Sequence, residues 1–511
     1  MILVKDAGRQ LADEWRMIAI DPPLALSLRA KSQVDCASAS SIADYPTTSV
    51  PPLARHWTGL AVSSLVLAGL LSLAVVVGRL PFMSGLINDP LFFKRCLVVH
   101  VDLALIVWFY AFIAALADLR VPGLCTIGQR ASWWSAATGM ALMLAGAAVP
   151  GSLPVLANYI PVIDHPLFLT GLGLFFASVL AFFFQKVIAR PRQAAGRLPE
   201  DASVGILTAA LAVFLAATSW ISARAGLPDG LDPWTRAEFS SWGAGHVLQV
   251  ANVSAMIAVW LWLLARATGC PVFTRRQARC LFGLLLAPHF VMPLLTWRGS
   301  LNQLYLDGAT FLMRWGIFPI LLVSLLACIN HLRRHCPDPA DQPARFARAA
   351  FKVSLSLSLL GMALGAAIRG STTLIPAHYH ASLGAVTAAF MAAAFLIVEA
   401  AARDSGRLDA LTRLWRPARH QILLFGIGQG IFALGFGLGG IFGLGRKAYA
   451  SEQIVRSAGE WAGLAIMGAG GLVAVAAGIW FLVLIIREMR RWAPITMPQS
   501  PIPAISTHAS P

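Results

Sequence analysis

Five histidines lie inside long apolar stretches of the sequence, and their chemistry needs an explanation. They are His100, His246, His289, His378 and His380. An imidazole is costly to bury in lipid without a partner, and ionisable groups at membrane depth usually face a bundle interior and mark a functional site. Imidazole is also the commonest side-chain ligand for metals. The sequence therefore predicts a metal, with haem iron favoured. An isolated core histidine bonded to a backbone carbonyl is the alternative at each position.

The most informative local pattern is the segment Ala377-His378-Tyr379-His380. Two helical residues separated by one are about 200° apart, so His378 and His380 face opposite sides of their helix. Two cofactors, one on each side, can then each take one ligand. His380 would share a six-coordinate haem with His100, and His378 would hold a five-coordinate haem with an open position. His246 and His289 remain for a second metal, and imidazoles suit copper or iron there.

The composition fixes the class of protein that must position these side chains. The chain has 511 residues, of which 57% are hydrophobic and 13% charged, so it is an integral membrane protein. Lipid leaves free backbone groups without partners, so each span is helical. We predict an all-α, polytopic bundle of about twelve transmembrane helices, each long enough to cross roughly 30 Å of hydrocarbon. The predicted spans are 58–79, 93–118, 131–149, 166–190, 204–226, 238–266, 276–297, 305–328, 346–368, 374–402, 420–445 and 457–487.

The charge pattern predicts the orientation. The net charge is +16, and the basic residues concentrate in the loops after even-numbered spans. By the positive-inside rule, both termini are cytoplasmic, in a bacterial-type inner membrane. The five histidines then fall toward the outer face. This excess is a topology signal, so we expect lipid and no nucleic acid as a partner. The seven cysteines form no C-x-x-C and are expected to be free thiols, with no thiolate metal cage or c-type haem attachment.

The chain ends differ from the apolar centre in composition. Residues 1–55 are polar and rich in proline, and are expected to form a disordered cytoplasmic extension. Residues 56–490 would form the membrane domain. Residues 491–511, rich in proline and serine, are expected to be a disordered tail.

From its first to its last span, the chain resembles the catalytic subunit I of the haem-copper oxygen reductase superfamily, which includes cytochrome c oxidases and nitric oxide reductases. The segment around His100 is similar to the family's low-spin haem ligand in span two. The resemblance assigns His378 to the high-spin haem and His380 to the low-spin haem. The segment from Trp242 to His246 is similar to the one that binds the family's active-site copper. A further likeness in the loop after span eleven implies that Arg446 and Lys447 hold haem propionates.

The sequence departs from the family around the second metal. Pro288-His289 provides one histidine where the family usually has two adjacent ones. One turn after His246 stands Val250, where oxygen reductases often carry tyrosine and nitric oxide reductases glutamate. The second metal is therefore copper with an unidentified third ligand, non-haem iron, or absent. Gln249 is a possible substitute ligand, and Tyr305 a possible substitute for the missing tyrosine.

The resemblance implies the catalytic subunit of a respiratory terminal oxidase. Electrons would pass from a low-spin bis-histidine haem to a high-spin haem and metal centre that reduces oxygen to water, with His378, His246 and His289 in the catalytic site. Without a copper motif of its own, the chain would need an electron-donor subunit, either a cytochrome c or a copper-bearing subunit. A nitric oxide reductase, a twelve-span transporter and a haem protein without catalysis are the alternatives. No proton-channel motif matches.

Three charged residues within the spans also need partners. Arg314 is too deep to reach the interface easily, and Asp307, two turns away on the same helix face, is its expected partner. Asp102 is expected to bond elsewhere in the bundle rather than to His100. Glu399 lies near the inner end of its span and is expected to be an interfacial charge.

Overall fold

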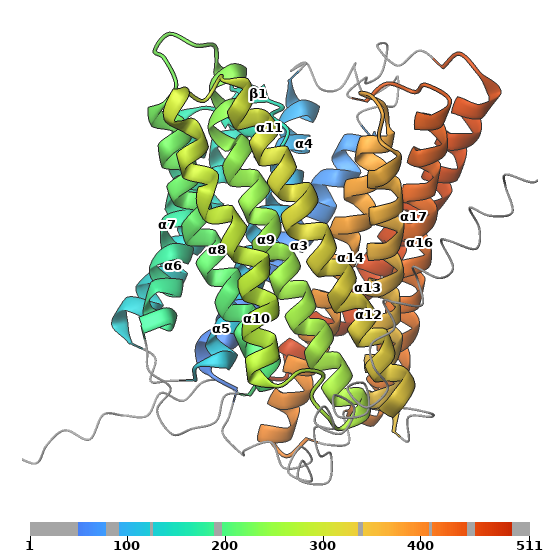
Figure 1. The fold of residues 1–511 in the computed structure, drawn as a ribbon. Helices are drawn as coiled ribbons and strands as arrows, with labels where there is room; N and C mark the ends of the chain where they lie inside the picture. The colour runs from blue at the N-terminus through green and yellow to red at the C-terminus, as the bar shows by residue number, and fades with distance from the viewer. Residues whose placement is uncertain are drawn as a thin grey trace, which may run out of the picture.

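The computed structural model describes residues 50–77, 91–122, 126–188, 197–335, 341–407, 411–446 and 455–492. Most of them lie in long helices that run side by side as one bundle (Figure 1). The helices are α3 (Pro52–Val77), α4 (Phe92–Asp102), η3 (Leu103–Val107), α5 (Trp108–Arg120), α6 (Ile127–Ala148), α7 (Pro166–Ile188), α8 (Glu200–Ala225), α9 (Pro233–Thr268), α10 (Arg275–Leu286), η4 (Ala287–Arg298), α11 (Gln303–Leu312), η5 (Met313–Ile317), α12 (Phe318–His335), α13 (Gln342–Ala367), α14 (Leu374–Asp404), α16 (Trp415–Ile441) and α17 (Ala458–Met489). Strands β1 (Leu153–Val155) and β2 (Val162–Asp164) form an antiparallel hairpin with Pro154 opposite Ile163.

Eleven helical rods in the described part of the chain are long and apolar enough to cross a membrane. Three of these rods are composite, because α4–η3–α5, α10–η4 and α11–η5–α12 each run as one span. Helix α6, the third predicted span, has 22 residues but is not among the eleven. The prediction of a multi-pass helical membrane protein is confirmed, whereas the count of twelve stays a prediction.

Two sequence-based expectations about the chain outside the spans need comment. Helix α3 begins at Pro52, so it takes in the last residues of the segment expected to be an extension. Residues 1–49 and 493–511, where the disordered extension and tail are expected, lie outside the described residues. Cys270 is disulfide-bonded, so the expectation of free thiols is wrong for that residue, while Cys96, Cys280 and Cys328 are free.

The bundle has two distinct ends. The hairpin end carries β1 and β2 at the top of Figure 1, and the first turns of α9 lie against it, because Asn158 donates its backbone N–H to Glu238. At the opposite end, the last turn of α9 meets the last turn of α14 through Arg266 and Glu399. Helices α9 and α14 therefore run in the same direction, and both begin at the hairpin end. This places His246, His378 and His380 in the half of the bundle nearer that end.

Close helix packing depends on glycine where two backbones approach each other. A Cβ atom on Gly139 of α6 would lie 2.7 Å from the carbonyl oxygen of Gly171 of α7, and one on Gly171 would lie 2.6 Å from that of Gly139. In α17, a Cβ on Gly463 would lie 2.5 Å from the backbone nitrogen of Gly439 in α16. Small residues at such contacts are typical of helices that pack within lipid.

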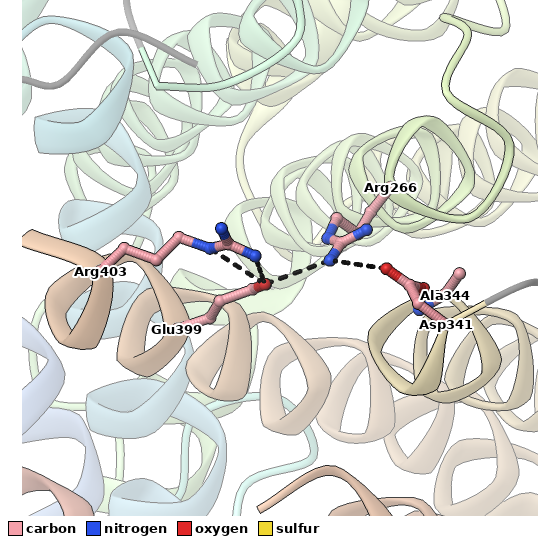
Figure 2. Close-up of polar contacts among 5 residues, drawn as sticks. All are labelled: Arg266, Asp341, Ala344, Glu399 and Arg403. Carbon is pink, nitrogen blue, oxygen red and sulfur yellow. Dashed lines mark hydrogen bonds and ion pairs between the residues drawn. The ribbon is translucent and has the colours of Figure 1, made fainter. Parts of the chain in front are cut away.

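Glu399 is the centre of a charged cluster at the end opposite the hairpin (Figure 2). Its Oε1 lies 3.2 Å from Arg266 of α9 and 2.8 Å from Arg403 of its own helix, and its side chain is only 7% exposed. Asp341 lies 3.5 Å from Arg266 and accepts from the backbone nitrogen of Ala344, which caps α13. Glu399 is thus a buried link between three spans, rather than the simple interfacial charge expected from the sequence.

Replacing Glu399 with glutamine should lower stability, because Arg266 then loses its buried counter-charge. We expect a loss of about 1–3 kcal/mol, below that of a fully buried pair because the arginines are partly exposed. Unfolding of the purified protein in mixed micelles by increasing SDS would measure it. R403A is the matched control, since that side chain is 55% exposed and its loss should cost less. Equal effects of the two substitutions would contradict this account of the cluster.

The expected pairing of Arg314 with Asp307 is wrong. Asp307 accepts instead from the side chain of Gln303 at 2.9 Å, and Arg314 is exposed and forms no ion pair within the described residues. The two residues are two helical turns apart, about 10 Å along the axis, and Asp307 has a nearer partner in Gln303, one turn before it in α11.

Candidate functional site

The two histidines of α14 contact different neighbouring helices. His378 Nδ1 lies 2.7 Å from the carbonyl oxygen of Gly361 in α13, and its ring packs edge-on against Phe318 of α12. The ring of His380 packs against Phe432 and Phe436 of α16, at 4.8 and 5.5 Å between centroids. The two imidazoles are thus directed to opposite sides of α14, as the one-residue spacing predicts.

His100 is held by α3 and lies near His380. Its Nδ1 lies 2.8 Å from the carbonyl oxygen of Ala68 in α3, and a positive charge on it would act on the His380 ring. The π-helix η3 begins three residues after His100, and such turns are frequent at functional sites. The structure therefore brings together the two histidines expected to share one haem.

The donor atoms of these histidines fit haem. A carbonyl oxygen can only accept, so Nδ1 of His100 and of His378 carries the hydrogen and Nε2 carries the free lone pair. Histidines that bind metals usually donate their other ring N–H in this way. His380 makes no ring hydrogen bond to any residue described by the structure, so either of its nitrogens is available. All three imidazoles belong to partly exposed residues, although the surrounding helices are largely buried. The three side chains thus suit axial haem ligation.

Gly365 of α13 leaves the space that the His378 ring occupies. A Cβ atom at this position would lie 2.7 Å from His378 Nδ1. We expect G365A to push the ring off its bond with Gly361 and to lower the content of the haem that the sequence predicts for His378, while the haem predicted for His100 and His380 stays unchanged. Pyridine haemochrome assay and optical spectra would measure both. G478A is the control, because a Cβ there meets nothing within 4 Å. Unaltered spectra of G365A would contradict the proposed role of His378.

His246 and His289 lie near each other on α9 and η4, close enough for their charges to interact. His246 has both ring nitrogens occupied, because Nδ1 lies 2.7 Å from the carbonyl oxygen of Trp242 and Nε2 lies 2.8 Å from the hydroxyl of Tyr159. His289 Nδ1 lies 3.1 Å from the carbonyl oxygen of Leu285, and its buried Nε2 has no hydrogen-bond partner among the described atoms. The two predicted ligands of a second metal are therefore neighbours, but only one has a free nitrogen.

The side chains around this pair do not fit a second metal as they lie. Among the described residues, no group of three or more histidine, cysteine, aspartate or glutamate side chains could hold an ion. Gln249, the possible substitute ligand, forms no hydrogen bond with another described residue. Tyr305, expected as a substitute near His246, is tied to the α9 backbone instead: its hydroxyl accepts from Gly243 at 2.7 Å and donates to Phe239 at 3.2 Å.

Sequence reasoning missed Tyr159. This residue lies in the hairpin between α6 and α7 and contacts His246. Its ring packs edge-on against Trp242 at 5.5 Å, and a side chain on Gly245 would overlap it. Burial, together with the neighbouring charge of Glu238, raises the pKa of Tyr159, so its hydroxyl keeps its proton and donates to His246. No motif pointed to Tyr159, because it lies in a loop between spans, about 90 residues from its partner in the sequence.

The basic pair expected to hold propionates is partly described. Arg446 Nε donates to Ser371 at 3.0 Å, and the neighbouring carbonyl of Leu444 accepts from Thr373 at 2.9 Å. These bonds hold Arg446 beside the start of α14, just before the two histidines. Lys447 lies outside the described residues. Sequence reasoning missed Arg369, an exposed arginine in the same turn.

Asp102 was expected to bond elsewhere in the bundle, but it forms no hydrogen bond within the described part of the chain. Both of its oxygens are fully buried and lack hydrogen bonds to any other described residue. The structure offers no physical account of how this carboxyl is stabilised.

Comparisons with known proteins agree with the fold and leave the activity open. No family model matches the chain. An uncharacterised protein of Aquifex aeolicus is 29% identical over 351 residues, which cover 67% of this chain and 84% of that protein. An uncharacterised protein of Rickettsia prowazekii is 24% identical over 84% of this chain and 95% of its own length. Among solved structures, a cryo-EM structure of a heme-copper terminal oxidase dimer aligns with a TM-score of 0.56 and 14% identity, covering 86% of this chain and 84% of that one. The chain is therefore similar in fold to a heme-copper terminal oxidase.

Proposed function

We propose that the chain is the haem-bearing catalytic subunit of a respiratory terminal oxidase that reduces oxygen to water. The observation that carries this proposal is the arrangement of α14, where His378 and His380 are directed to opposite sides and His100 lies beside His380. That arrangement supplies ligands for two separate haems, one with two imidazoles and one with a single imidazole. The fold similarity to a heme-copper terminal oxidase supports the same assignment.

Each of these side chains would have a separate role in binding the cofactors. His100 and His380 would hold the low-spin haem and His378 the high-spin haem, with the carbonyls of Ala68 and Gly361 orienting the rings. When bound, haem supplies one-electron transfer and an open iron position for a small oxidant. Arg446, at the hairpin end, and Lys447 would pair with anionic carboxylates.

The reacting side of the site is the side that His378 faces. Gly316 of η5 is so close to His289 that a Cβ would lie 2.7 Å from its ring, and Phe318, two residues later, packs against His378. The His289 and His378 rings thus contact the same short stretch of one rod. We assign His246 and His289, which lie near each other, to the catalytic site together with His378.

The remaining parts of the proposal follow from what the sequence lacks and from its charge pattern. Without a C-x-x-C or a thiolate copper motif, electrons must come from a donor subunit that carries a cytochrome c haem or copper. The basic loops support a location in a bacterial-type cytoplasmic membrane with both termini inside.

Oxygen consumption by the purified, reduced protein tests this function. We expect uptake of oxygen with an artificial electron donor, and its loss in H378A. Nitric oxide reductase is the second candidate, favoured by Val250 one turn after His246 and by the single histidine in η4. Consumption of nitric oxide without oxygen uptake would select that candidate, and an absence of haem would favour a transporter.

A further inference from the structure

We propose that Tyr159 is a positioning residue that occupies Nε2 of His246 and keeps this imidazole from binding a metal. A hydrogen-bonded Tyr159–His246 pair then stands where the second metal of the site is expected. The inference rests on the proposed function only for its place beside His378, and its test needs no catalytic activity.

The first step is the assignment of hydrogens on His246. Its Nδ1 lies 2.7 Å from the carbonyl oxygen of Trp242, which can only accept, so Nδ1 carries the hydrogen. Nε2 is then the nitrogen with the lone pair, and the Tyr159 hydroxyl, 2.8 Å away, donates to it. A metal ion would need the same lone pair. Tyr159 and a metal therefore compete for one atom.

The second step is that the hairpin is built to hold Tyr159 in place. Glu238 of α9, only 4% exposed, accepts from the backbone of the preceding residue, Asn158, at 2.7 Å and also from its side chain. The Tyr159 ring lies over Gly245, where any larger residue would overlap it, and packs against Trp242. Glu238, Gly245 and Trp242 all belong to α9, the helix that carries His246. The hydroxyl is therefore held by the same helix as its acceptor.

The third step concerns His289, whose Nε2 is not occupied by a hydrogen bond as Nε2 of His246 is. Its Nδ1 donates to Leu285, which leaves a buried Nε2 lone pair without a hydrogen-bond partner among the described atoms. One imidazole alone is a weak site for a transition-metal ion. If the hydroxyl of Tyr159 is removed, His246 and His289 together present two imidazole nitrogens, which suit copper. Loss of the hydroxyl should therefore increase metal affinity.

The experiment titrates Cu²⁺ into purified full-length protein that has been treated with a chelator. A competing chelator of known affinity reports the Kd of wild type, Y159F, H246A and Y159F/H246A. We expect Y159F to bind one Cu²⁺ about tenfold more tightly than wild type, the equivalent of one hydrogen bond no longer in competition. The gain should vanish in Y159F/H246A. N158A, which removes only the side-chain bond to Glu238, should give a smaller gain in the same direction.

Y305F is the matched control, because Tyr305 is also a buried tyrosine bonded to α9 but does not contact His246. Its copper affinity should equal that of wild type, and circular dichroism would verify that each variant is folded. A wild-type protein that binds one Cu²⁺ tightly through His246, with no change in Y159F, would overturn the inference. Haem content in the same preparations reports the proposed function separately, since two haems with unchanged copper binding would refute only the role of Tyr159.

Discussion

Alanine in place of His380 is expected to remove one haem, and alanine in place of His378 a different one. In each variant the haem content should fall from about two per chain to about one, because in the proposed function each ring would be the axial ligand of its own iron. H380A and H100A should lose the same low-spin signal, since these two rings lie beside each other. H378A should retain that signal and lose the high-spin species that binds carbon monoxide. Pyridine haemochrome assay with optical and EPR spectra measures each case.

H420A is the control for these histidine variants. His420 is exposed, six residues into α16, and lies far along the chain from the site. Its replacement should leave both haems in place. A single spectral change common to H378A and H380A would mean that the two residues serve one iron, and the opposite directions of their rings would then have no functional meaning.

The largest effect on stability is expected from Asp118. Its carboxylate lies 2.5 Å from Lys186 Nζ, with side chains 2% and 3% exposed, and it also accepts from the backbone of Ala54 at 2.7 Å. Among the described residues, D118A leaves the buried ammonium group with the carbonyl of Val121 and the ring face of Phe182 as its partners, and with no counter-charge. We expect a loss of about 3–5 kcal/mol, the usual result of removing one half of a buried ion pair. SDS unfolding in mixed micelles would measure it.

The double variant D118A/K186M separates charge burial from packing. Because it removes both charges, it should recover most of the stability lost in D118A. If D118A loses less than about 1 kcal/mol, the pair is effectively solvated and contributes little, as surface pairs do.

Features that depend only on nearby residues, such as the spans and the directions of side chains on a regular helix, could be predicted from the sequence. Spans follow from apolar length, because lipid excludes unpaired backbone groups. The opposite directions of His378 and His380 follow from the geometry of a regular helix, and α14 is regular there. Helix α6 shows the limit of this reasoning: serine, threonine, tryptophan and glycine residues between 131 and 148 make it less apolar than its neighbours, although it packs with α7 as a span would.

The contacts that depend on irregular backbone or on distant segments could not be predicted. The pairing of Arg314 with Asp307 relied on helical spacing alone, and Asp307 instead bonds the nearer side chain of Gln303. Tyr305 was expected to substitute for the missing tyrosine near His246, but its hydroxyl is bonded to the backbone N–H of Gly243. Tyr159 reaches His246 only because a loop folds back over the bundle, and no helical periodicity encodes such a contact.

The central claim is that one helix holds two haems, one on each side. The most direct test is the haem content of the intact wild-type protein together with its reduced and oxidised optical and EPR spectra. The account predicts two haems per chain, one low-spin with two imidazoles and one high-spin that binds carbon monoxide. A purified, folded protein without porphyrin, or with one haem that has the same spectrum in H378A and wild type, would contradict it.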